Sequence, residues 1–511
     1  MQVSTYSYKS YHYFAVRLKK IMPDLVFGVQ TSTKSALDFL KNQKDIDYWI
    51  FEKDPSFFAD KVTKYQGLHD FEQLLRHKSL WRVVATDRML GRAYLYGTEG
   101  YEFKQKSNRN YILKAFSAKL KWFEALFQEF SPDIFMPAMA MSDVGVTIIK
   151  QLCDKYDVIY AVPDSLRVQN YCCFTNTPQI VFPIIDETYQ KLLNDHNSID
   201  LNPAIKLYNQ MTSEFDAPSY FDAVNEKMKK IDFTFAIKIK KILVLIYNLT
   251  KLLLSGEIFH DKYKGYQEMR NYILLTLQHL RFSGSRFGTI LKQDQKYLYY
   301  PLHLNPEYST LNQGTMFGNQ LTVIEALAKS IPVDWVVYVK EHPAMVKEIV
   351  RSKYFYYRIR ELPNVEIAPT YANTDTLISN AEMVVVINGT SGWEAILRGK
   401  PVVTLSDYMF NVMGLSSKCT DLEKLSIKIH DEVNRAKKIN IKERKRRILI
   451  FLLAVIECGF WISHPNEFFY IQPGTDEEYQ LCGEELASGF VKYLNYLQKE
   501  KGYSFGIPQE T

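Results

Sequence analysis

Cysteine is scarce in this sequence. The 511 residues contain six widely separated cysteines, with neither the close CxxC pairs of a zinc site nor the density of a secreted disulfide scaffold. The first residues lack the basic start and apolar run of a secretory signal. We therefore expect reduced thiols, no cysteine-based metal centre and a cytoplasmic location.

Long apolar runs are also missing. Two stretches, Ile242–Leu254 and Ile448–Ile462, are shorter than the roughly 20 residues of a membrane-spanning helix, and each contains a charged side chain. We expect both to be packing helices. A basic run, Lys442–Arg447, precedes the second stretch, so peripheral contact with the inner face of a membrane is the alternative.

A strong excess of one charge is absent as well. The 63 basic and 57 acidic residues give a net charge of +6, which is too small and too dispersed to predict a nucleic-acid partner. The sequence also lacks a GxxxxGK[ST] loop, an HExxH helix, a GxSxG elbow and a protein-kinase signature. Several common enzyme classes are thereby excluded.

The sequence does contain an α/β rhythm. Its length exceeds what one hydrophobic core sustains, which predicts two Rossmann-type domains facing a cleft. We expect an N-terminal Rossmann-like domain over 1–195, a helical insertion over 196–292, a C-terminal Rossmann-like domain over 293–440 and C-terminal helices packing across the domains over 441–511. The expected strands are Tyr48–Phe51, Arg82–Ala85, Asp133–Pro137, Val158–Val162, Ile180–Pro183, Tyr297–Pro301, Trp335–Lys340, Val365–Ala368, Met383–Ile387 and Val402–Leu405.

The most informative segment is MVVVINGTSGWEAILRGKPVVTL, in which an apolar strand runs into a helix. Small residues at this junction let backbone N–H groups approach an anion, and the helix N-terminus adds its positive dipole. The segment predicts a phosphate site, with Glu394 placed to accept hydrogen bonds from ribose hydroxyls. The phosphate site comprises Asn388, Gly389, Thr390, Ser391 and Gly392. The alternative is that these residues only cap and turn the chain.

A second segment, WVVYVKEHP, brings charged side chains to the end of another strand, where Pro343 stops it. Lys340 offers a positive charge to phosphate, and His342 can donate to a phosphate oxygen or protonate a leaving group. Glu341 is either a catalytic carboxylate or a buried structural one.

Two further regions supply candidates. The loop of YLYYPLHLNPEYST carries His303 and Glu307 toward the expected cleft. In the first half, Arg167 is a candidate for pairing with a carboxylate or phosphate of the substrate. Three aspartates, among which the sequence does not choose, could act as base or nucleophile; they are Asp87, Asp143 and Asp164.

The motifs KEHP and NGTSGWEAILRGKPVV, about 45 residues apart, resemble those of the capsule polysaccharide biosynthesis family of bacterial sugar transferases, and PLH-x-x-PE resembles surface carbohydrate biosynthesis members. The family includes transferases of CMP-linked 3-deoxy-manno-octulosonic acid. The resemblance implies a GT-B architecture with nucleotide phosphates held by His342, Thr390 and Ser391, ribose near Glu394, and Pro343 shaping the turn.

The resemblance further implies a glycosyltransferase that moves sugar from a nucleotide donor to a surface or capsular polysaccharide. Its partners would be a nucleotide sugar and an oligosaccharide or lipid-linked glycan acceptor. No metal or other cofactor would be obligatory, because a helix dipole, His and Lys can stabilise the leaving nucleotide. Two alternatives stay open: a sugar-nucleotide epimerase or hydrolase, and a non-catalytic subunit of capsule assembly or export.

Overall fold

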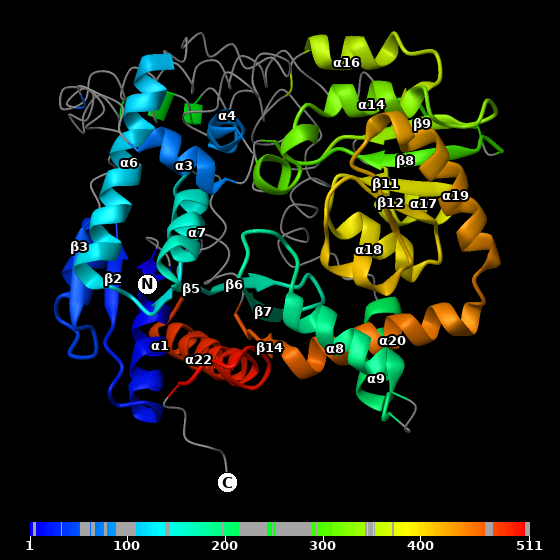
Figure 1. The fold of residues 1–511 in the computed structure, drawn as a ribbon. Helices are drawn as coiled ribbons and strands as arrows, with labels where there is room; N and C mark the ends of the chain where they lie inside the picture. The colour runs from blue at the N-terminus through cyan, green and yellow to red at the C-terminus, as the bar shows by residue number, and fades with distance from the viewer. Residues whose placement is uncertain are drawn as a thin grey trace.

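Figure 1 shows the computed structural model of the chain. The structure describes residues 1–511 except 4–6, 32, 52–61, 63–66, 76–78, 88–108, 138–143, 196–198, 214–242, 245, 248–249, 251–287, 293, 306, 308, 343–344, 346–350, 352, 370–371, 465–473 and 506–511.

A six-stranded, wholly parallel sheet forms the centre of the second half (Figure 1). Its strands are β8 (Tyr297–Pro301), β9 (Val336–Lys340), β10 (Val365–Ile367), β11 (Met383–Val386), β12 (Val402–Thr404) and β13 (Ser417–Lys418). The spatial order is β10-β9-β8-β11-β12-β13. The chain therefore winds outward from β8 in one direction and then from β11 in the other, so a topological switch point lies between these two strands.

Helices cover both faces of this sheet. They are α14 (Gln320–Ala328), α16 (Lys353–Arg360), α17 (Thr374–Asn380), α18 (Thr390–Leu397) and α19 (Leu425–Lys438). In β8, Leu298 and Tyr300 belong to the core beneath α14, α16 and α19. Tyr297 and Tyr299 belong to the core beneath α17 and α18. Successive strand residues point to opposite faces, and their all-apolar composition suits a sheet buried on both sides.

The first half has shorter parallel sheets. One contains β1 (Gln2–Val3), β2 (Gly28–Thr31) and β3 (Tyr48–Phe51), and the other pairs β4 (Ile134–Phe135) with β5 (Ile159–Tyr160). The Gln2 amide donates to the Met136 carbonyl at 2.8 Å, which joins the two sheets edge to edge. The accompanying helices are α1 (Tyr8–Ile21), α2 (Lys34–Leu40), α3 (Leu68–Leu74), α4 (Leu80–Val84), α6 (Arg109–Phe130) and α7 (Val144–Tyr156).

The C-terminal part of the chain returns to the first half. Its strand β14 (Phe460–Trp461) pairs with β7 (Tyr171–Thr175), which also pairs with β6 (Val162–Ser165). The long helix α22 (Asp476–Lys501) lies along α1, seen as red beside blue in Figure 1. Helix α20 (Ile441–Cys458) packs against α8 (Pro183–Asn194) and α9 (Asn202–Ser213). One hydrophobic core thus joins α20 and α8 to α18 of the second half.

The expected α/β class is confirmed, and the expected strands of the second half match β8 to β12. Two expected strands of the first half are wrong. Arg82–Ala85 overlaps helix α4, whose N-terminus is capped by the Ser79 hydroxyl accepting from the Trp81 amide at 3.2 Å. Ile180–Pro183 contains no strand, because Pro183 starts helix α8, a position that proline favours. The domain boundaries stay predictions.

The two apolar stretches have different outcomes. Ile448–Ile462 begins inside α20, and residues 448–455 are all buried in the shared core, as expected for a packing helix. Most of Ile242–Leu254 lies outside the described residues. Among the helices that are described, none has the length and apolar character needed to span a bilayer.

Candidate active site

The switch point of the six-stranded sheet is bridged by one side chain. His303 follows β8, and its Nε2 contacts the backbone carbonyl of Asn388, which follows β11. The same nitrogen lies 3.4 Å from the Asn388 backbone N. Gln320 holds the histidine backbone from both sides: its Oε1 accepts from His303 N at 2.8 Å, and its Nε2 donates to His303 O at 3.0 Å. The two loops are therefore fixed relative to each other.

The Asn388 side chain is a second tie between these loops. Its Nδ2 donates to the Ser309 carbonyl at 3.0 Å, to Gln313 Oε1 at 2.9 Å and lies 3.3 Å from Ser406 Oγ. The sequence predicts that Asn388 binds phosphate. The residue is 1% exposed, and its side chain is instead used to hold the two loops together. Its position leaves the backbone of the following residues to face a ligand.

Helix α18 begins immediately after this tie. Gly389 adopts φ +113°, a left-handed conformation that favours glycine, and no side chain caps the helix. The first amide N–H groups of a helix have no partner within it, so Thr390 and Ser391 offer donors to an anion. Gly392 has a different role: an added Cβ would lie 2.8 Å from Phe410, so this glycine allows close packing of α18.

Two polar side chains, one from β9 and one from α18, influence each other's charge. Lys340, at the end of β9, donates from Nζ to Thr374 Oγ1 at 2.7 Å, and burial lowers the pKa of its ammonium to about 8. Glu394 is on the first turns of α18, and burial raises the pKa of its carboxyl to about 7, although Arg398 and Lys340 oppose the shift. Each group lowers the cost of the other's charge. The sequence-predicted phosphate and ribose residues thus come together.

Glu341 makes the contacts of a structural carboxylate. Its Oε2 accepts from Arg351 Nε at 2.9 Å and from the Tyr356 hydroxyl at 2.6 Å, and its Oε1 accepts from the His342 amide at 2.7 Å. Arg351 also donates from Nη2 to the His303 carbonyl at 2.6 Å. Glu341 and Arg351 are at most 2% exposed. The ion pair therefore joins the loop after β9 to the loop after β8.

His342 lies among positive groups. Burial lowers the pKa of its imidazole to about 3, and the charges of His303, Arg351 and Lys340 act in the same direction. Burial likewise lowers the pKa of His303 to about 4. Both rings are neutral at pH 7, and an anion entering this cluster would favour their protonation. Pro343 lies outside the described residues.

The loop candidate Glu307 lies near this edge of the sheet. Its Oε2 accepts from the Ser309 hydroxyl at 2.9 Å, next to the segment that Asn388 binds. The first half approaches here too, since Gln179 Nε2 donates to the Asn312 carbonyl at 3.4 Å. The loop after β7 therefore contacts this site loop.

The first-half candidates lie on separate elements. Asp87 is 3% exposed and its Oδ2 accepts from the Val144 amide at 3.0 Å, so it caps helix α7. Arg167 lies in the hairpin between β6 and β7 with φ +53°. Asp164 is next to it, and burial raises the pKa of that carboxyl. Asp143 lies outside the described residues. The catalytic roles of these residues stay predictions.

Sequence reasoning missed three residues that organise the site: Gln320, Arg351 and Tyr356. Each of these residues forms hydrogen bonds with a backbone or buried group that is distant in the sequence, so no short sequence motif predicts it. Within the described residues, no cluster of His, Cys, Asp and Glu could hold a metal ion.

Comparison with known proteins gives two sequence matches. Residues 250–448 match the family described as "Capsule polysaccharide biosynthesis protein". Protein FixF of Sinorhizobium fredii is 36% identical over 91 residues, which span 17% of this chain and 20% of FixF.

Several solved structures are similar at low identity. Thermosulfurimonas dismutans KpsC, a beta Kdo 2,7 transferase, is 12% identical, with a TM-score of 0.30 over 72% of this chain and 89% of that chain. The KpsC beta Kdo 2,4 transferase is 14% identical, with a TM-score of 0.30 over 68% and 86%. The UDP-GlcNAc 2-epimerase of Methanocaldococcus jannaschii is 13% identical, with a TM-score of 0.24 over 97% and 100%. Values this low do not identify a substrate or a reaction.

The family match covers the loops and strand ends described above, from β8 through the whole of α18. Residues 250–448 are therefore similar to the capsule polysaccharide biosynthesis family, and the match covers less than half of the chain.

Proposed function

We propose that this protein is a glycosyltransferase that takes a sugar from a nucleotide donor and adds it to a growing surface or capsular polysaccharide. The family match of residues 250–448 supports the biosynthetic context. The nucleotide would bind at the carboxyl ends of β8, β9 and β11, where doubly wound sheets bind their ligands.

One observation carries the proposal: an uncapped helix N-terminus and several basic side chains meet at the switch point. Gly389 precedes α18, whose first amides, those of Thr390 and Ser391, would donate to the phosphate oxygens. Lys340 is the last residue of β9, which pairs with β8, and His342 follows that strand. A diphosphate or phosphodiester is the ligand whose charge matches this arrangement. Glu394 would then bind the ribose hydroxyls.

The chemistry follows from where charge develops. Transfer breaks the bond between the anomeric carbon and the phosphate oxygen, and that oxygen leaves with the bonding electrons. The α18 amides and Lys340 would stabilise this negative charge. The acceptor hydroxyl forms the new bond and gives its proton to a base, for which the imidazole of His342 is our candidate, because a bound phosphate beside it would raise its lowered pKa. In this scheme no metal is required for the leaving group.

The test uses a negative charge at the proposed phosphate site. Ser391→Glu places a carboxylate at the second position of α18, where it suits the helix dipole but repels a phosphate. Ser426→Glu is the matched control, because Ser426 holds the same position in α19. Calorimetric titration with CMP, UDP, GDP and their sugar conjugates should show selective binding that only Ser391→Glu abolishes. Equal binding by both variants would refute the site.

Turnover then separates the enzyme from its alternatives. Sugar transfer that requires a glycan acceptor supports the transferase. Release or epimerisation of the sugar without an acceptor would favour an epimerase or hydrolase, and nucleotide binding without turnover would favour a non-catalytic assembly subunit. His342→Ala should weaken nucleotide binding, because the imidazole is one of the groups proposed to face the phosphates, and should lose turnover even at saturating nucleotide if the imidazole is also the base.

A further inference from the structure

One corner of the described structure carries a dense cluster of basic residues. Eight of the thirteen residues from Arg435 to Arg447 are Lys or Arg, and one, Glu443, is acidic. This segment therefore carries a formal charge of +7, whereas the whole chain carries +6.

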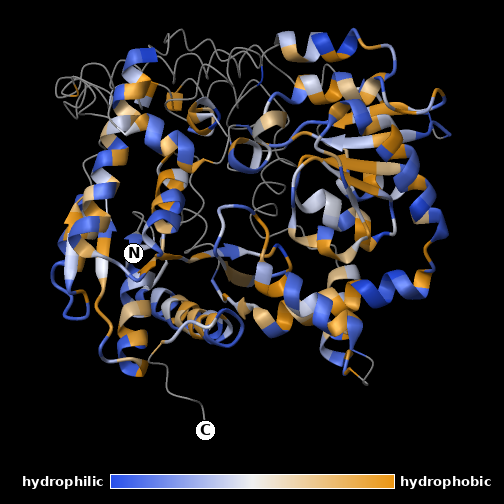
Figure 2. Cartoon of the chain, viewed as in Figure 1, coloured by the Kyte–Doolittle hydropathy of each residue, from blue (hydrophilic) through white to orange (hydrophobic). Residues whose placement is uncertain are grey.

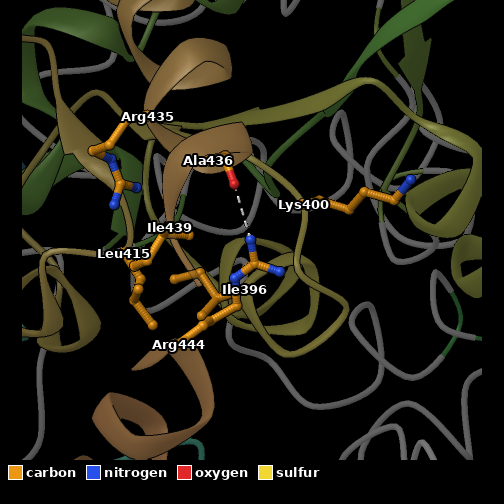
Figure 3. A pocket seen from close by; sticks show the side chains of 7 residues that line it. All are labelled: Ile396, Lys400, Leu415, Arg435, Ala436, Ile439 and Arg444. Carbon is orange, nitrogen blue, oxygen red and sulfur yellow. Dashed lines mark hydrogen bonds between the residues drawn. The ribbon is translucent and has the colours of Figure 1, made fainter. Parts of the chain in front are cut away.

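The corner is the junction between α19 and α20, and its cations fall into two groups. Arg435, Arg444 and Arg447 serve the fold: they donate to the carbonyls of Gly414, Ala436 and Met413, respectively. Figure 3 shows Arg444 reaching the Ala436 carbonyl in a small hollow also lined by Lys400 and Arg435. An added Cβ on Gly399 would lie 2.3 Å from Arg444, so this arginine packs tightly against the turn after α18.

The second group is exposed; it comprises Lys437, Lys438, Lys442, Lys445 and Arg446. Ile441 lies in the middle of these cations and is 77% exposed, although it starts a helix whose later residues are buried. Figure 2 shows α20 changing from hydrophilic at its start to hydrophobic along its length. An exposed isoleucine surrounded by lysines is the composition of surfaces that bind at a lipid interface.

We propose that the α19–α20 corner docks the protein on an anionic lipid bilayer. The cations would face lipid phosphates, and Ile441 would enter the boundary between headgroups and acyl chains. The corner adjoins the C-terminal end of α18, whereas the proposed nucleotide site is at the N-terminal end of the same helix. Docking would thus leave the nucleotide site unobstructed and hold it close to an acceptor carried on lipid.

A lipid surface fits better than a soluble polyanion because of Ile441. A polysaccharide or nucleic acid would bind through the cations alone. An exposed isoleucine at the centre of the basic cluster would add nothing to its affinity. The two occupants therefore differ in how binding responds to salt and to Ile441→Ser. Lipid binding should weaken in salt but retain a component that depends on Ile441.

The test measures binding of the full chain to vesicles by co-flotation. Phosphatidylcholine vesicles are compared with vesicles that also contain phosphatidylglycerol, and the variant is Lys437→Gln/Lys438→Gln/Lys442→Gln. Lys34→Gln/Lys41→Gln/Lys44→Gln is the control, because it removes the same charge from exposed lysines of the first half. Melting temperature and nucleotide binding, measured on each variant, verify the fold.

Wild type and control should bind only the phosphatidylglycerol vesicles, and the corner variant should lose about a hundredfold in partition coefficient. Ile441→Ser should weaken binding several-fold more in high salt than in low salt. Absence of binding to anionic vesicles, or equal binding by the two triple variants, would overturn the proposal. So would binding that Ile441→Ser leaves unchanged, which is the result expected for a soluble polyanion. Because nucleotide binding is measured separately, failure here leaves the proposed function intact.

Discussion

The His303 imidazole and the Asn388 backbone meet across the switch point of the sheet, where the loop after β8 contacts the loop after β11. The contact places a titratable ring against the first turn of the proposed phosphate site. This contact indicates that His303 positions the loop after β11. The sequence alone instead predicts that His303 faces the substrate cleft. The two roles predict different behaviour of variants.

His303→Ala should destabilise the protein by about 1–3 kcal/mol, because it removes a partner of buried backbone groups. It should also weaken nucleotide binding, since the start of α18 loses its support. His303→Gln keeps a side-chain donor and should recover most of the stability in chemical denaturation. A ring that only contacts substrate would give the opposite pattern, with unchanged stability in His303→Ala and no recovery of binding in His303→Gln.

The carboxyl of Glu394 should make stability depend on pH. Its pKa is about 7 in the folded protein and near the ordinary 4.5 when unfolded, so the folded state binds more protons between these values. The free energy of unfolding should therefore fall, from this group's contribution, as pH rises from 4.5 to 7.

Glu394→Gln removes that titration. The melting temperature of the variant should therefore increase relative to that of the wild type as pH rises from 4.5 to 7. Nucleotide binding supplies the contrast. Ribose hydroxyls donate to the ionised carboxylate, so wild-type affinity should rise as pH passes 7 and Glu394→Gln affinity should not. A parallel pH dependence of the two proteins would show that Glu394 keeps its ordinary pKa.

The buried ion pair between Glu341 and Arg351 should show strong coupling. Arg351→Met leaves a carboxylate without its charged partner and should cost about 3–5 kcal/mol of unfolding free energy. Adding Glu341→Gln removes the buried charge and should recover a substantial part of that cost. Urea denaturation of both single variants and the double variant measures the coupling, and strictly additive effects would contradict it.

The sequence predicts the second half of the fold better than the first. The strands β8, β9 and β11 are short apolar runs ended by glycine, proline or charge, and these local signals survive in the structure. Arg82–Ala85 fails because Leu80, Val83 and Val84 are buried at helical spacing, and four residues do not distinguish a period of 2 from 3.6. Local patterns therefore suffice where a strand is buried on both faces.

The candidate site likewise contains residues that local sequence patterns predict and residues that they do not. Motifs at strand ends identify Lys340, His342 and Thr390, because parallel strands bring their carboxyl ends to one edge. The supports of that edge, such as Gln320 and Arg351, bind loop backbones 17 and 48 residues away from them. Long-range pairing of this kind depends on the tertiary fold, and one sequence does not encode it in any short pattern.

Asp87 offers a test between capping and catalysis. Its carboxylate accepts from the Val144 amide at the start of α7, and loss of such a cap costs about 0.5–2 kcal/mol. Asp87→Ala should therefore lower the melting temperature. Asp87→Asn keeps an acceptor oxygen and should remain near wild-type stability.

Turnover of Asp87→Asn decides between the roles, because an amide can cap a helix but cannot take a proton from an acceptor hydroxyl. We expect this variant to keep the sugar-transfer rate of the wild type, with a pH profile of the same shape. A loss of a hundredfold or more at unchanged stability, on the order of a missing general base, would instead return Asp87 to the catalytic role that its place in the sequence first indicated.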